Sequence, residues 1–264
     1  MRLAALSHDI SLPRKPSAPP WAIAWGRRLF AYRNWVFAPV ACGLFLHAWR
    51  MQTVPCTTFD IVGFALGAAI AAWAAAVRVG CAGSVLPDSC GRGRAFRAER
   101  LITVGWYAAC RNPLYLANAM LWAAGCLFAR APWAVVPTVA FVVGMYRLML
   151  VAEEDFLRRR FQAAYLEYCR RVPRFLPRPN RFRSAPVEKT SEHRPFSLRQ
   201  AIFREHDTLA LLLVGAWTLC GIAGGGWQVP RWRLMIDSIP ALVFVATAWP
   251  AVKLWKQAIR RRSA

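Results

Sequence analysis

The sequence predicts an all-α, multi-pass integral membrane protein with about six transmembrane helices and one interfacial amphipathic helix. Two observations predict this class: 57% of the 264 residues are hydrophobic, and the 35 basic residues lie in blocks between long apolar runs. About 20 consecutive apolar residues suffice for a transmembrane helix, and basic blocks between such runs are typical of cytoplasmic loops. This pattern accounts for the net charge of +22 without a nucleic-acid partner.

Six apolar runs are the expected spans. They cover residues 35–49, 59–79, 113–129, 132–152, 208–222 and 234–252. The first run is short for a span, and we expect residues 29–32 to extend it. The third and fourth runs are separated only by Arg130 and Ala131, which predicts a helical hairpin. Small residues in the second run, such as Gly67 and Ala71, predict close helix packing.

After the fourth run the pattern changes to that of an amphipathic helix over residues 153–171. Leu157, Phe161, Tyr165 and Tyr168 recur at helical spacing, and arginines cover the other faces. A helix with one apolar and one basic face lies along a membrane surface, so we expect this one at the interface.

Composition divides the chain into three parts. Residues 1–34 are an N-terminal cytoplasmic arm, residues 35–178 form the membrane core, and residues 179–264 form a linker and two additional spans. Most Lys and Arg lie in four segments: residues 1–34, 78–111, 153–207 and 253–264. The positive-inside rule therefore predicts that these segments, and both termini, are cytoplasmic.

Eight cysteines are scattered along the chain, and no pair has the Cys-x-x-Cys spacing of zinc or redox sites. We therefore expect no metal. Cys81 and Cys90 lie on the reducing side of the predicted topology, so we also expect no structural disulfide.

Two adjacent carboxylates stand at the cytoplasmic end of the fourth apolar run. Glu153 and Glu154 are costly at that depth without a partner. One interpretation pairs them with the arginines at 158–160. The other makes them a pair that binds a cation or a hydroxyl group and faces a cavity.

A second polar element, Arg111-Asn112-Pro113, opens the third run. Asn112 is a favoured N-cap and Pro113 is well tolerated in the first helical turn, so capping alone would explain both. A helix N-terminus also suits an anion. With carboxylates at 153 and 154, the two elements would fit a zwitterionic or sulfonium ligand that carries a carboxylate.

Together these motifs resemble the isoprenylcysteine carboxyl methyltransferase and phospholipid methyltransferase superfamily over residues 78–178. The matching positions, in order, are Gly105, Tyr107, Arg111, Pro113, Tyr115, Glu153, Glu154, Phe161, Tyr165, Tyr168, Val172 and Pro173. Two positions depart from the family pattern. Asn112 replaces a histidine, and Gln162 replaces a glycine, a change that we interpret as structurally minor.

The resemblance implies methyl transfer from S-adenosylmethionine, with no metal, through cofactor motifs at 99–118 and 152–173. The implied cofactor-binding residues are Glu99, Arg100, Leu101, Ile102, Tyr107, Arg111, Asn112, Pro113, Leu114, Tyr115 and Glu153. The implied partner is a membrane lipid or a lipidated substrate. The compact size and the two-span tail resemble bacterial members, which implies the bacterial inner membrane. The sequence makes no prediction of oligomeric state.

The motif contains no histidine, which favours an acceptor that is already ionised and needs no general base. We therefore expect O-methylation of a lipid phosphate or a prenylcysteine carboxylate. The alternatives are N-methylation of a phospholipid amine, an NADPH-dependent membrane reductase of the sterol reductase type, and a non-catalytic scaffold that binds anionic lipid.

Three residues are the expected catalytic set: Arg147, Glu153 and Glu154. Arg147 lies two helical turns before Glu154, so the two share roughly one helix face. We hypothesise that Arg147 holds the anionic head of the acceptor. The alternative is an arginine whose side chain extends to the membrane surface.

Overall fold

The computed structural model describes residues 18–83, 96, 98–178 and 196–223, and all regular structure within these ranges is helical. This confirms the all-α class. The elements are α1 Pro20–Ala31, α2 Arg33–Met51, α3 Thr58–Gly83, α4 Trp106–Ala109, α5 Pro113–Phe128, a 3-10 turn at Pro132–Ala134, α6 Val135–Arg171 and α7 Leu198–Ala223.

The described residues contain two helices that are long and apolar enough to cross a membrane, Thr58–Gly83 and Pro132–Arg171. A third span results if α1 and α2, which meet at 65°, count as one broken span. Helix α5 is apolar but has only 16 residues. The predicted count of six is therefore not confirmed, and the last predicted span, 234–252, lies outside the described residues.

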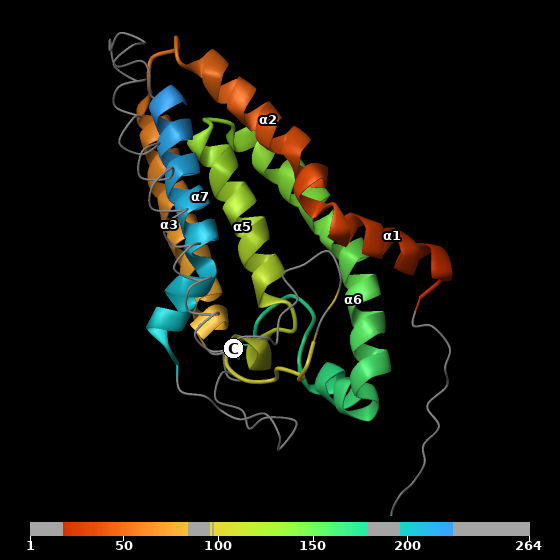
Figure 1. Cartoon of the computed structure of the whole chain (residues 1–264). Helices are drawn as coiled ribbons and strands as arrows, with labels where there is room; N and C mark the ends of the chain where they lie inside the picture. Colours follow the sequence, from red (N-terminus) through yellow and green to blue (C-terminus); the bar gives the residue numbers. More distant parts are fainter. Residues whose placement is uncertain (1–17, 84–95, 97, 179–195, 224–264) are drawn as a thin grey trace, which may run out of the picture.

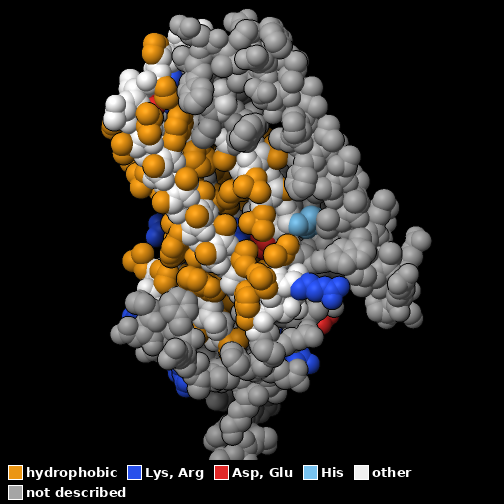
Figure 2. Space-filling model, turned by 90° about the vertical axis from the view of Figure 1, so that its left-hand side faces the viewer, with side chains coloured by type: hydrophobic (Ala, Val, Ile, Leu, Met, Phe, Trp, Pro, Cys, Tyr) orange, Lys and Arg blue, Asp and Glu red, His pale blue; other side chains and the backbone are white. Residues whose placement is uncertain are grey.

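Helices α3, α5 and α7 run side by side, and α6 lies against α5 on the side away from α3 (Figure 1). The predicted close packing of α3 occurs at Gly67, where a Cβ would press on the Phe128 ring, and at the buried Ala71. Large apolar side chains such as Phe59 and Leu66 point outward. Figure 2 shows that apolar side chains cover most of the described surface on this side, as expected of a surface in contact with lipid.

Arg130 organises the end of the bundle where α5 turns into α6. Its backbone adopts a positive φ of 57°, which closes the predicted helical hairpin. Its guanidinium donates to the carbonyls of Val54 and Pro55 at 2.8 Å each and pairs with Asp60 at 2.8 Å. Because these partners lie between α2 and α3 or at the start of α3, one side chain joins the two connections at this end.

The predicted amphipathic helix is not a separate element. It is the second half of α6, which continues for 37 residues and bends at Gln162, where φ is 44° and ψ is −117°. Its apolar face is buried within the protein, since Tyr165 and Tyr168 pack against Leu101. A left-handed φ strongly favours glycine. The interpretation of Gln162 as a minor departure is therefore wrong.

Both predicted flanking regions contribute to the core. Residues 20–31, assigned to the N-terminal arm, form α1, which packs so closely on α6 that a Cβ at Gly26 would clash with the Leu148 carbonyl. At the other end, α7 begins at Leu198, well before the predicted run at 208. Helices α1 and α7, which lie outside the boundaries drawn at 34 and 178, therefore contact the helices between those boundaries.

The bend in α6 generates a stability prediction. Gln162→Gly should stabilise the protein by about 1 kcal/mol, because a left-handed backbone strains any residue with a Cβ. Ala163→Gly, at the exposed helical position next to it, should destabilise by about 1 kcal/mol through the entropic cost of glycine. The melting temperatures of both purified variants in detergent measure this. A lower melting temperature for Gln162→Gly would contradict the argument.

Candidate active site

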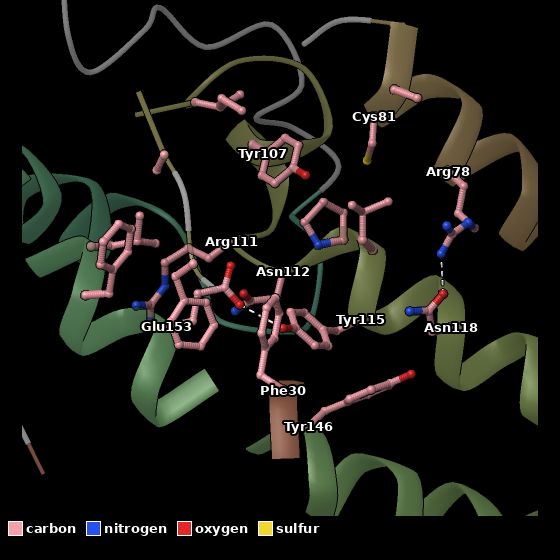
Figure 3. Close-up of a pocket in the computed structure, with 18 of the residues that line it drawn as sticks. Phe30, Arg78, Cys81, Tyr107, Arg111, Asn112, Tyr115, Asn118, Tyr146 and Glu153 are labelled. Carbon is pink, nitrogen blue, oxygen red and sulfur yellow. Dashed lines mark hydrogen bonds between the residues drawn. The ribbon is translucent and has the colours of Figure 1, made fainter. Parts of the chain in front are cut away.

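A cavity of about 640 Å³ opens at the end of the bundle where α3 ends and α5 begins (Figure 3). Its walls come from the junction of α1 and α2, the end of α3, the segment from 96 to 115, the middle of α6 and the first half of α7. The cavity therefore brings together segments that are far apart in the sequence.

Two segments, one around residue 111 and one around residue 174, lie next to each other beneath the helices, and we call them the floor of the cavity. The Arg111 N–H donates to the Pro173 carbonyl at 2.9 Å, and the Arg178 N–H donates to the Ala109 carbonyl at 3.0 Å. The chain enters this floor through Gly105, whose φ of 62° suits glycine and directs the following turn, α4, toward the cavity.

Asn112 occupies the predicted N-cap position of α5, but its side chain makes no capping hydrogen bond. Its Nδ2 instead donates to the Arg174 carbonyl at 3.0 Å. The amide therefore joins the two floor segments, a role that the capping preference of asparagine does not predict.

Glu154 is held between two arginines of the floor. Arg174 binds it through Nε and Nη2, both at 2.9 Å, and Arg111 Nη1 lies 3.3 Å from its Oε1. Such a bidentate pair has a defined geometry. Of the predicted partners at 158–160, Arg159 pairs instead with Asp155 at 2.9 Å. Glu154 thus fixes the floor to α6 and does not line the cavity.

Glu153 points into the cavity, where the Tyr115 hydroxyl donates to its Oε2 at 2.7 Å (Figure 3). The Tyr115 ring packs edge-on against Tyr146, with 4.8 Å between centroids. Tyr146 lies two helical turns before Glu153, so both project from the same face of α6. The two neighbouring glutamates thus have different roles, one toward the ligand space and one toward the floor.

The structure does not bring Arg147 to this site. Its side chain is exposed on α6, and it is absent from the cavity wall. The physical reason is the helical repeat, since each residue turns the side-chain direction by about 100°. Tyr146 takes the cavity face, and its neighbour Arg147 points away. The placement of Arg147 therefore does not support its assignment as an acceptor-binding residue.

The other predicted residues divide clearly. Those that line the cavity are Arg100, Leu101, Ile102, Tyr107, Arg111, Asn112, Pro113, Leu114, Tyr115 and Glu153. Glu99 is exposed and, like Glu154, does not line it. These residues of the two motifs therefore lie around one cavity.

Several polar residues of the cavity wall were not predicted. They are Arg33, Asn34, Arg78, Asn118, Tyr146, Arg204, Glu205 and Thr208. Most of them lie outside the motif. Two of them could have been found from the sequence, because Arg78 and Asn118 are polar residues within apolar runs. Nothing in the sequence of α7 indicated that this helix reaches the cavity.

Two titratable groups of the floor have shifted pKa values. Burial raises the pKa of the Cys110 thiol, which donates to the Phe175 carbonyl at 3.0 Å. A neutral, buried thiol is a poor nucleophile. Burial acts to lower the pKa of Arg111, but Cys169 and Glu154 beside it outweigh that effect and raise the pKa overall. Arg111 is therefore a permanent positive charge.

The two glutamates should respond differently to the same substitution. Glu154→Gln should destabilise the protein by about 2 kcal/mol, because two arginines lose their charged partner in a half-buried setting. Glu153→Gln should change stability little, because Tyr115 can still donate to the amide oxygen. Melting temperatures of the purified variants test this difference. Equal losses for both would argue against a floor held by Glu154.

Comparison with known proteins gives two partial matches. The chain is 34% identical over 89 residues to the nickel-cobalt-cadmium resistance protein NccN of Alcaligenes xylosoxydans xylosoxydans, covering 33% of this chain and 41% of that protein. It is 34% identical over 84 residues to the cobalt-zinc-cadmium resistance protein CzcN of Cupriavidus metallidurans, covering 31% and 38%. The chain thus matches about two fifths of the length of each relative. No solved structure shows a significant match.

A family model gives the broader assignment. Residues 56–164 match the family described as phospholipid methyltransferase. This segment contains α3, α4, α5 and most of α6, and therefore the Tyr115–Glu153 pair and most of the cavity wall. The resemblance expected from the motifs is thereby confirmed over this segment, which is similar to the phospholipid methyltransferase family.

Proposed function

We propose that this protein is an S-adenosylmethionine-dependent membrane methyltransferase that methylates an anionic lipid or a lipidated acceptor. The observation that carries the proposal is the cavity built by the family segment, in which Tyr115 and Glu153 are joined at 2.7 Å beneath the start of α5. Small-molecule sites are concave, largely apolar and marked by a few convergent polar groups. This cavity is concave, and polar groups such as Glu153 and Arg111 converge on it beside aromatic side chains.

The residues present fit S-adenosylmethionine. A volume of about 640 Å³ lies within the range of small-molecule sites. Arg111 Nε is buried without a hydrogen-bond partner among the described residues, so a ligand carboxylate would satisfy it. Glu153 accepts a hydrogen bond and offers an acceptor to an amine or hydroxyl group, and the tilted rings of Phe30 and Phe96, with centroids 4.3 Å apart, provide an apolar wall. When bound, the co-substrate supplies a methyl group on a sulfonium.

The charge of the cavity favours an anionic acceptor. Five arginines and two glutamates line it: Arg33, Arg78, Arg100, Arg111, Arg204, Glu153 and Glu205. Adding a sulfonium ligand increases the positive excess, so an acceptor with a phosphate or carboxylate compensates it best. Such a group is already ionised near pH 7 and needs no general base. The side chains then act by positioning the reactants and excluding water.

The names of the two relatives concern resistance to nickel, cobalt, zinc and cadmium. Within the described ranges, no group of three or more His, Cys, Asp or Glu side chains is arranged to hold a metal ion.

The decisive experiment incubates membranes that contain the overproduced protein with methyl-labelled S-adenosylmethionine and then locates the label. We expect label in the acidic lipid or lipidated fraction. Glu153→Gln and Tyr115→Phe should lower the rate by up to about a hundredfold, since small losses of positioning have effects of that size. Arg147→Ala is the matched control, because that side chain is exposed on the same helix and should leave the rate unchanged.

Three other results would redirect the assignment. Label in an amine-bearing phospholipid would identify N-methylation instead. No label, together with binding of NADPH, would favour a reductase. No label, no NADPH binding and an unchanged cellular phenotype for Glu153→Gln would favour a non-catalytic lipid-binding protein.

A further inference from the structure

Helix α7 lies beyond the family segment, which ends at residue 164, yet it forms part of the same cavity. Arg204, Glu205 and Thr208 all line the space from α7. The side of the cavity that α7 covers is therefore built by a part of this chain that the family match does not include.

The start of α7 is fastened to the end of α3. The Ser197 N–H donates to the Gly83 carbonyl at 3.2 Å, and Gln200 Nε2 donates to the Ala82 carbonyl at 3.3 Å. The Phe196 ring occupies the space where a Cβ of Gly83 would lie. These contacts set where α7 begins relative to the mouth of the cavity.

A buried ion pair completes the attachment. Arg78 of α3 lies 2.7 Å from Glu205 of α7, and its Nη2 also donates to Thr208 at 3.0 Å. Asn118 of α5 accepts a further hydrogen bond from Arg78 (Figure 3). Glu205 is only 3% exposed. A buried charge is costly unless it is paired, so this cluster holds the guanidinium of Arg78 in one place.

The cluster faces the groups assigned to the co-substrate. Figure 3 shows Arg78 and Asn118 on one side of the cavity and Arg111 and Glu153 on the other. On the α7 side the cavity wall contains two arginines, Arg78 and Arg204, and one glutamate, Glu205, so its net charge is positive. Arginine is well suited to a phosphate group because its planar donors match the geometry of the oxyanion.

We propose that α7 is the acceptor wall of the cavity, fastened by the Arg78–Glu205 pair, and that it selects lipids whose anionic phosphate lies against Arg78 and Arg204. The proposal rests on the methyltransferase function proposed above. It adds that the recognition of the acceptor depends on a helix outside the family segment, while the recognition of S-adenosylmethionine does not.

The test measures two affinities separately, with the full-length protein in neutral detergent. The affinity for the acceptor is measured with dioctanoylphosphatidic acid, and dioctanoylglycerol serves as the matched probe without a phosphate. The affinity for the co-substrate is measured with S-adenosylmethionine. The double variant Arg78→Leu with Glu205→Leu removes both charges together, and replacing a buried pair by apolar residues is often neutral for stability. Arg204→Gln removes the neighbouring charge. Glu167→Gln is the control, since this half-exposed glutamate pairs with Arg171 away from the cavity.

We expect the wild type to bind dioctanoylphosphatidic acid more tightly than dioctanoylglycerol. The double variant and Arg204→Gln should each weaken binding of phosphatidic acid by about tenfold or more, equivalent to about 1.4 kcal/mol. Their affinity for S-adenosylmethionine, and the behaviour of the control, should stay unchanged. A rise in the acceptor KM with an unchanged kcat would report the same effect in the methylation assay.

Three outcomes would overturn the proposal. The first is a folded double variant that binds phosphatidic acid as tightly as the wild type does. The second is that both variants lose affinity for phosphatidic acid and for S-adenosylmethionine to the same extent. The third is a wild type that binds the two lipid probes equally well. If the wild type binds phosphatidic acid through these residues but does not bind S-adenosylmethionine, the acceptor wall stands as an anionic-lipid site and the methyltransferase function fails.

Discussion

The attachment of Glu154 to Arg111 and Arg174 is the interaction on which the site depends. It joins α6 to the floor formed by the segments around 111 and 174, at distances of 2.9 to 3.3 Å. Because the carboxylate of residue 154 is held toward the floor, the rotation of α6 is set, and Glu153 is directed to the cavity. The Tyr115–Glu153 hydrogen bond at the start of α5 follows from that rotation.

Charged contacts also join other helices or connections that are far apart in the sequence. Arg130 with Asp60 closes the end away from the cavity, and Arg78 with Glu205 joins α3 to α7. Apolar burial gives little orientation to helices that face lipid, because lipid chains are as apolar as the side chains they would replace. Paired charges have defined geometry and a high cost if separated, so they set which helices meet and in which orientation.

Much of this arrangement was predictable from local sequence. The start of α5 at Pro113 and the hairpin at Arg130 are where the sequence placed them, because proline and tight turns act over a few residues. The assignments that failed depend on rotation or on distant contacts. Arg147 is on the wrong face by one position, Gln162 adopts a left-handed backbone, and α7 approaches α3 across more than a hundred residues of sequence.

The sequence by itself determined the helical class, the resemblance to the phospholipid methyltransferase family and the polar residues that the motifs contain. Only the tertiary structure decided that Glu153 and Glu154 face different partners, and that α7 forms part of the cavity. The reason is geometric. Helical periodicity fixes side-chain directions relative to one another, but the rotation of each helix about its axis is set by contacts with other helices, such as those of Glu154 and Arg78.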